Sequence, residues 1–150
     1  MNDFDFLVGT WDSTQRRLRE RLAGSDDWDV FPGRSVAYRM FDGAANVDEI
    51  TFPTLGQAGM SVRLYEPATD RWTIHWASTA TPGVLFPPVH GRFTDGVGEF
   101  FGDDEHAGRP VRVRFRWSGI TATNARWEQA FSSDGGETWE TNWIMEFTRA

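Results

Sequence analysis

Hydrophobic and polar residues alternate along most of this chain with a period of two residues. The segment 109–118 shows it most clearly, because every second residue is apolar and three arginines lie between them (Val111, Val113, Phe115 and Trp117; Arg112, Arg114 and Arg116). The segments around Met60, Val62 and Leu64, and around Trp72, Ile74 and Trp76, repeat the pattern. Such alternation is typical of β-strands with one buried face.

Turn signals containing Gly, Pro or Asp separate ten such segments, and the short connections favour antiparallel hairpins. The predicted strands cover residues 8–22, 28–41, 45–52, 59–65, 72–78, 89–94, 98–103, 110–118, 124–132 and 138–148. An open sheet of ten strands would curl, and closure also removes exposed strand edges. The sequence therefore predicts an all-β fold over residues 1–150, one antiparallel up-and-down barrel of about ten strands, with a two-sheet sandwich as the alternative.

The N-terminal segment NDFDFL (2–7) is predicted to form a short helical turn. Its apolar residues Phe4, Phe6 and Leu7 would plug one end of the barrel. A ten-stranded barrel leaves more interior room than an eight-stranded one, so a pocket between the two barrel ends is expected.

The three arginines of segment 109–118 are expected to point outward. Facing inward, they would put charges into a low-dielectric space at a cost of several kcal/mol each. The neighbouring strands carry Glu128, Glu140 and Glu146 on their polar faces, so cross-strand Arg–Glu pairs are predicted outside. The inward alternative would be a barrel that binds anionic ligands such as fatty acids.

Composition narrows the function classes. The net charge of −7 argues against nucleic acid and anionic membranes as partners, and the basic run RRLRER (16–21) is the one local exception. The chain has no cysteine and no lysine, which excludes disulfides, thiolate chemistry and Schiff bases. We expect no signal peptide and no membrane span, a cytoplasmic location by default, and no cofactor. A homodimer is compatible with the sequence.

The motif Gly9-Thr10-Trp11 resembles the Gly-X-Trp that opens the first strand of lipocalins and other calycins. This resemblance implies that an arginine of the last strand, here Arg149, packs across the tryptophan. Four stretches covering nearly the whole chain resemble a bacterial family of unknown function with a calycin-like barrel (FDFLVGTWD, LYEPATDRWTIHW, GRFTDGVGEFFGDD and ARWEQAFSSDGGETWETNWIMEFTR). That family brings a fold and no established activity. The strand count also resembles fatty-acid-binding proteins and haem-carrying nitrobindins, but no histidine here matches the proximal haem ligand.

Two further motifs are interpreted as turns. SSDGGETW (132–139) resembles the Asp-box of sialidases and other β-proteins, in which the aspartate bonds to turn amides and the tryptophan packs beneath. The acids and histidine in GDDEHAGRP (102–110) are of types that bind metals, but adjacent acids in a hairpin favour a solvated turn. No metal site is predicted.

The predicted ligand site lies among aromatic residues that share the inward phase. The candidate ligand-binding residues are Trp76, Phe115, Trp117, Trp127 and Trp143 with the polar Gln129 and Thr141, and then Tyr38, Glu49 and His90 from less certain positions. The first hypothesis is a non-enzymatic barrel that binds a small apolar molecule. The alternatives are an isomerase, cyclase or hydratase using His90 with Glu49 or Tyr38, and haem binding through His75 or His90.

Overall fold

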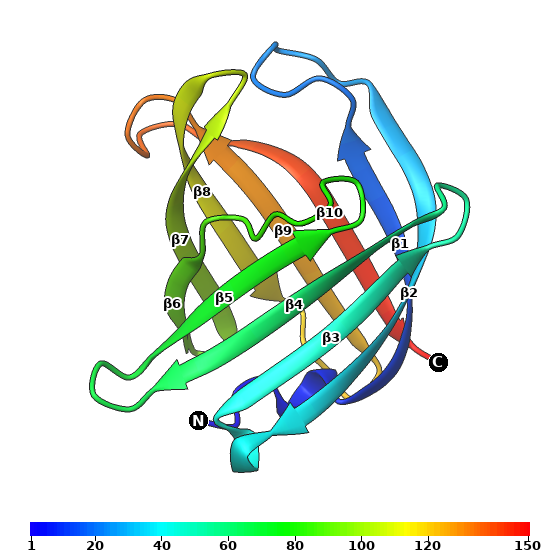
Figure 1. The fold of residues 1–150 in the computed structure, drawn as a ribbon, viewed down its shortest axis with the longest axis vertical. Helices are drawn as coiled ribbons and strands as arrows, with labels where there is room; N and C mark the ends of the chain where they lie inside the picture. The colour runs from blue at the N-terminus through cyan, green and yellow to red at the C-terminus, as the bar shows by residue number, and fades with distance from the viewer.

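Ten antiparallel strands close into one barrel in the computed structural model, which describes residues 1–150 (Figure 1). The strands are β1 (Gly9–Leu18), β2 (Trp28–Met40), β3 (Ala45–Phe52), β4 (Gln57–Glu66), β5 (Arg71–Ser78), β6 (Val89–Thr94), β7 (Val97–His106), β8 (Arg109–Ser118), β9 (Asn124–Ser132) and β10 (Glu140–Arg149). Each strand pairs with its neighbours in sequence, and β10 pairs with β1. The predicted up-and-down barrel of ten strands is confirmed.

The strand ends agree closely with the alternation, and the largest difference is at β1. This strand was expected to reach residue 22 but ends at Leu18. Leu22 and Gly24 adopt positive φ values of 58° and 67°, which extended strands do not use. The β1–β2 connection therefore bends over one end of the barrel instead of extending the wall.

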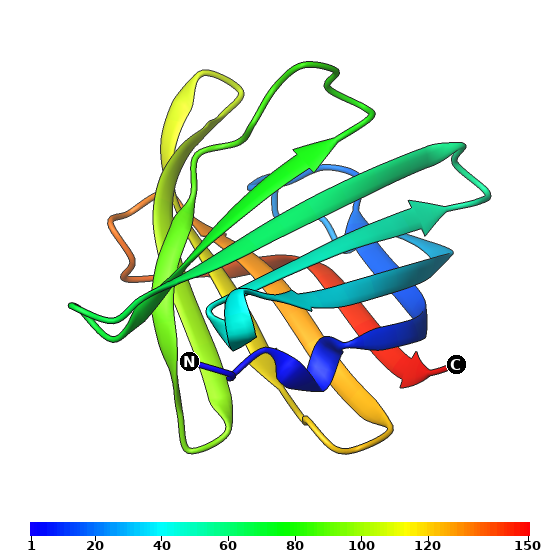
Figure 2. The same cartoon turned by 60° about the horizontal axis from the view of Figure 1, so that its bottom comes forward.

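The N-terminal segment closes the other end, where both chain termini lie (Figure 2). A 3₁₀ turn, η1 (Asp5–Leu7), puts Phe4 and Leu7 into the barrel with 1% and 3% of their surface exposed. The Phe4 ring packs edge-on against Trp72 and Phe93, with centroids 4.9 and 5.1 Å apart. The predicted plug is thus confirmed, with Phe6 partly buried beside it. A second 3₁₀ turn, η2 (Phe41–Gly43), links β2 to β3, and no helix is long and apolar enough to cross a membrane.

The seam between β1 and β10 is fastened by Arg149. Its guanidinium lies 4.1 Å from the centre of the Trp11 ring and donates hydrogen bonds to the carbonyls of Val8 and Phe6, at 2.8 and 2.7 Å. Trp11 is fully buried and donates its indole N–H to the carbonyl of Leu7. The packing of Arg149 across Trp11, which the calycin resemblance implied, is confirmed. The N-terminal plug is tied to the seam by the same contacts.

The arginines of β8 point outward, as their charge-burial cost predicted. Arg112 pairs with Asp103 at 3.2 Å, and Arg114 stacks 4.9 Å from the centre of the Trp139 ring. The expected pairing with the glutamates of β9 and β10 is not found for these arginines. Glu128 and Glu146 pair instead with Arg126, which is two residues from Glu128 on β9 and directly opposite Glu146 on β10.

On β4 the predicted inward face is wrong. Met60 and Leu64 were expected inside but are 47% and 39% exposed, whereas Ser61 and Arg63 are 8% and 4% exposed. The reason is a polar network within the wall, because Arg63 faces Asn46 on β3 and bonds to it. The barrel therefore has polar residues inside and apolar residues outside along β4, the reverse of β8.

Candidate functional site

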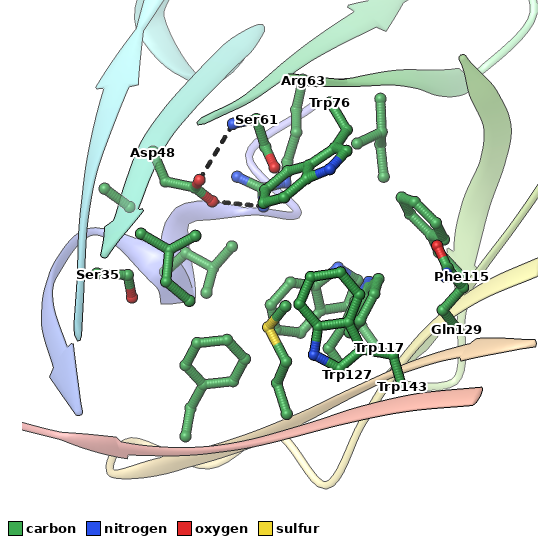
Figure 3. A pocket seen from close by; sticks show the side chains of 16 residues that line it. Ser35, Asp48, Ser61, Arg63, Trp76, Phe115, Trp117, Trp127, Gln129 and Trp143 are labelled. Atoms are coloured by element: carbon green, nitrogen blue, oxygen red, sulfur yellow. Dashed lines mark hydrogen bonds and ion pairs between the residues drawn. The ribbon is translucent and has the colours of Figure 1, made fainter. Parts of the chain in front are cut away.

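The barrel interior contains two adjacent spaces above the N-terminal plug. The inner chamber is small, with a cavity volume of about 50 Å³, and lies between Arg63, Trp117 and Trp143 (Figure 3). The mouth, at the end opposite the plug, has a cavity volume of about 320 Å³. Five residues border both spaces, namely Ile74, Trp76, Phe115, Gln129 and Trp143. Since binding pockets usually measure about 300–1,000 Å³, the mouth is the larger part of any ligand site.

Large side chains fill the lower half of the barrel. Phe4, Trp72 and Phe100 are each at most 1% exposed and pack together beneath the chamber. Of the aromatic residues predicted to line a cavity, Trp117 forms the floor of the chamber and also contacts Phe4, with ring centroids 6.4 Å apart. The aromatic side chains therefore form both a solid core in the lower half of the barrel and the wall of the chamber above it.

Six of the ten predicted site residues line the chamber, and they come from β5, β8, β9 and β10 (Trp76, Phe115, Trp117, Trp127, Gln129 and Trp143). Trp143 lies at the centre of this group, with its ring centroid 5.6 Å from that of Trp127 and 6.1 Å from that of Trp76. Its indole N–H donates to the buried amide of Gln15 at 2.8 Å. This bond fixes the ring where it borders both the chamber and the mouth.

Two predicted site residues lie outside the barrel, because the residues of β2 and β3 that face inward are one position away from those that were predicted. Tyr38 is 57% exposed, and its strand neighbour Ala37 lines the chamber instead. Glu49 is exposed on the outer surface, while Asp48 and Ile50 line the chamber. A shift by one residue moves every side chain of a strand to the other face of the wall. The prediction that Tyr38 and Glu49 face the interior is wrong.

His90 and Thr141 also lie outside the chamber. His90 pairs with Thr73, which alternates with inward-facing Trp72 and Ile74, and its Nδ1 lies 2.9 Å from the Thr73 hydroxyl. Burial, then the charge of Arg71, lowers the pKa of His90. Thr141 shares the sequence phase of Trp143, but the pairing of β10 with β9 shifts between these two residues. This bulge reverses the phase, so Thr141 is opposite the outward-facing Ala130.

These positions exclude the residue pairs predicted for catalysis and the histidines predicted to bind haem. His90, Glu49 and Tyr38 all lie on the outer face, so none can act on a molecule in the chamber. His75 also points outward, as expected from its alternation with Trp72, Ile74 and Trp76. Neither histidine could ligate a haem iron held inside the barrel.

A buried ion pair that the sequence analysis missed gives the chamber its polar side. Arg63 donates to Asp48 at 2.6 Å and to Asn46 at 2.8 Å, and the Asp48 carboxylate also accepts the backbone N–H of Ser61 (Figure 3). The side chains of Arg63 and Asp48 are only 4% and 12% exposed. The guanidinium lies 5.1 Å from the centre of the Phe4 ring. The chamber thus has a charged wall opposite Trp127 and Trp143.

One sequence signal for this pair was available. Asn46 and Asp48 are two residues apart and so share a strand face, and Arg63 lies on the next strand. The alternation of Met60, Val62 and Leu64 on β4 hides this signal, because it indicates an apolar face that would be expected to point inward.

The Asp-box is a structural turn at the rim, as predicted. The Asp134 carboxylate accepts hydrogen bonds from the hydroxyls of Ser132 and Thr138 and from the backbone N–H of Thr138. Those bonds hold the pKa of Asp134 well below its usual range. Trp139 donates its indole N–H to the carbonyl of Gly136 at 3.1 Å. No group of three or more His, Asp and Glu side chains in the chain is arranged to hold a metal ion.

No family model and no curated protein match this chain. Among solved structures, the S-type phycobiliprotein lyase CPES from Guillardia theta is similar over 98% of this chain and 90% of its own. The sequence identity is 11% and the TM-score is 0.41. The evidence for the fold is therefore the strand pairing of the chain itself.

Proposed function

We propose that this protein binds a small, largely apolar molecule that enters through the mouth and extends toward the aromatic chamber. One observation carries the proposal: the mouth cavity of about 320 Å³ adjoins a space walled by tryptophans and shares five of its lining residues. Small-molecule sites are typically concave, mainly apolar, and supplied with a few polar groups. Trp76, Phe115 and Trp143 would contact the ligand where the two spaces adjoin, with Gln129 as a polar contact.

Binding is favoured over catalysis by the state of the polar groups. Asp48 is the one carboxylate that lines the chamber, and both of its oxygens already accept hydrogen bonds, from Arg63 and from the Ser61 amide. A general base needs a carboxylate that is free to take a proton from the substrate. The isomerase, cyclase or hydratase alternative therefore has no free carboxylate in the chamber to support it, and the residues predicted for it, His90 with Glu49 or Tyr38, lie outside the chamber.

Family and location belong to the same proposal. The Trp11–Arg149 stack at the seam is a feature shared with calycins, and it supports membership of the bacterial calycin-like family of unknown function. A cytoplasmic location and a homodimer stay predictions.

A test of the binding proposal combines native mass spectrometry of the protein as purified with titration of N-phenyl-1-naphthylamine, a neutral fluorescent probe. We expect saturable binding that quenches tryptophan fluorescence. Val113→Phe puts a ring into the mouth, where Val113 is part of the wall, and should weaken binding. Val30→Phe makes the same change at a residue that is 61% exposed, and should leave binding unaltered. Equal binding by both variants, or no binding by the unmodified protein, would refute the proposal.

A further inference from the structure

Three arginines border the interior spaces, and only one of them is paired. Arg63 in the chamber is bonded to Asp48. Arg17 at the end of β1 and Arg21 in the β1–β2 connection border the mouth and take part in none of the ion pairs of the chain. Neither guanidinium donates a hydrogen bond to any protein group, in contrast to Arg63 with its two. Two cations with unused donors therefore face the mouth.

Aromatic rings hold both guanidinium groups in place. Arg17 lies 4.9 Å from the centre of the Phe31 ring and 5.0 Å from that of Trp143. Arg21 lies 5.3 Å from the centre of the Phe131 ring. Stacking on a ring occupies the flat face of a guanidinium and leaves the N–H groups at its edge free. The guanidinium nitrogens of Arg17 and Arg21 have no hydrogen-bond partner, yet they are not buried. They are therefore exposed to solvent, and both residues border the mouth.

None of the acidic residues near the mouth forms an ion pair with Arg17 or Arg21. Asp103 pairs with Arg112 on the outer face, Asp104 accepts the backbone N–H of Glu105, and the exposed side chain of Glu105 takes part in no ion pair. Asp29, the carboxylate whose charge acts on Arg17, pairs with Arg19. Glu140, the carboxylate that acts most on Arg21, accepts the backbone N–H of Leu22 at 2.7 Å. Burial and then the charge of Arg17 lower the pKa of Arg21 to about 10, so Arg21 is still charged at neutral pH. Arg17 is also a cation, because the arginine side chain is not deprotonated in proteins. Two partly buried like charges would be stabilised by an anion between them.

We infer that the ligand is an amphipathic organic anion, whose carboxylate, sulfonate or phosphate group binds Arg17 and Arg21 while its apolar body lies against Trp143 and Phe131. This inference rests on the proposed function and adds the chemical class of the ligand. Arginine suits the role because its planar donors match two oxygens of such a group. The apolar part would then point toward Trp76, away from solvent.

The test compares two probes that differ only in a sulfonate group. These are 1-anilinonaphthalene-8-sulfonate, an anion, and N-phenyl-1-naphthylamine, its neutral counterpart. We expect the anion to bind at least about tenfold more tightly, and its affinity alone to fall as salt is raised. Failure of both probes to bind would refute the proposed function. Equal affinity for both would leave that function standing and overturn the anion site.

Variants then assign the effect to the two arginines. Arg17→Met and Arg21→Met should each weaken binding of the sulfonate by about tenfold and leave the neutral probe unaffected. Arg16→Met is the matched control, because Arg16 is the neighbouring exposed arginine that stacks on Trp28 and does not border the mouth. A similar loss for both probes would show that the arginines only support the cavity, and would overturn the inference. Retained binding of the neutral probe also shows that each variant is folded.

Discussion

Breaking the buried ion pair in the chamber should cost far more stability than breaking an exposed one. Asp48→Ala removes the closest partner of Arg63, a guanidinium that is 4% exposed and bonded at 2.6 Å. Removing one partner of a buried pair typically costs about 3–5 kcal/mol, because the other charge is left without compensation. Arg63 keeps its bond to Asn46 and its contact with the Phe4 ring, so we expect the lower end, about 3 kcal/mol.

Urea unfolding followed by circular dichroism measures this effect, since tryptophan emission would also report changes in the chamber. Asp12→Ala is the matched control. It breaks an Asp–Arg pair of almost the same length, 2.7 Å, in which both side chains are more than half exposed. Exposed pairs contribute about 0–1 kcal/mol, so the control variant should be nearly as stable as the parent.

A double-mutant cycle separates the pair interaction from packing. Arg63→Met keeps much of the volume of the side chain and removes its charge, so the double variant Asp48→Ala/Arg63→Met should be more stable than the sum of the single losses implies. The expected coupling is about 1–3 kcal/mol. If Asp48→Ala costs no more than the Asp12 control, or if the coupling is zero, the pair does not stabilise the wall as argued here.

Three more predictions concern stability. Gly59→Ala places a Cβ 1.9 Å from the far end of the Trp76 ring, which can move into the chamber, so we expect a cost of about 1–3 kcal/mol and weaker binding of the neutral probe. Gly91→Ala meets a backbone oxygen at the same 1.9 Å and should cost more in urea unfolding; the reverse order would contradict this reasoning. Arg149→Met removes three hydrogen bonds to backbone carbonyls and should lower the free energy of unfolding by at least about 1.5 kcal/mol, so an unchanged urea midpoint would be a clear failure. The pKa of Asp134 is lowered in the fold, so its contribution to stability is fully present above about pH 4, the usual pKa of an unfolded Asp, and is lost as the pH falls toward the much lower pKa of the folded state. In urea unfolding, the difference between Asp134→Asn and the parent should therefore be largest at pH 7 and should shrink steadily below about pH 4; a difference that does not change with pH would contradict this reasoning.

The number and order of the strands could be read from the sequence because both are local properties. Alternation marks each strand, and residues such as Gly96 or Asp70, which adopt positive φ in the turns, mark where it ends. Ten strands joined by short turns leave few topologies, and closure of the barrel follows from the need to pair its edges. The Trp11–Arg149 seam was also predictable, because a motif at each end of the chain pointed to it.

The inward face was predictable only where the two faces differ strongly in polarity. On β8 the arginines oppose apolar residues, and the charge-burial cost decides the orientation. On β4 the choice was between Met60 with Leu64 and Ser61 with Arg63, and the polar face is inside because Asp48 of another strand compensates the charge. A partner contributed by another strand cannot be seen in the pattern of one strand.

The site itself was decided by the tertiary structure. The bulge before Trp143 reverses the face of Thr141 in a strand whose alternation is otherwise regular. The basic run 16–21 is one charged segment in the sequence, but in the fold it divides between the outer surface and the mouth, where Arg17 and Arg21 form no ion pair. The sequence by itself determined the barrel, because strand formation depends on neighbours along the chain. Only the tertiary structure decided where the barrel is filled and where it is open, because packing and charge compensation depend on side chains brought together from distant strands.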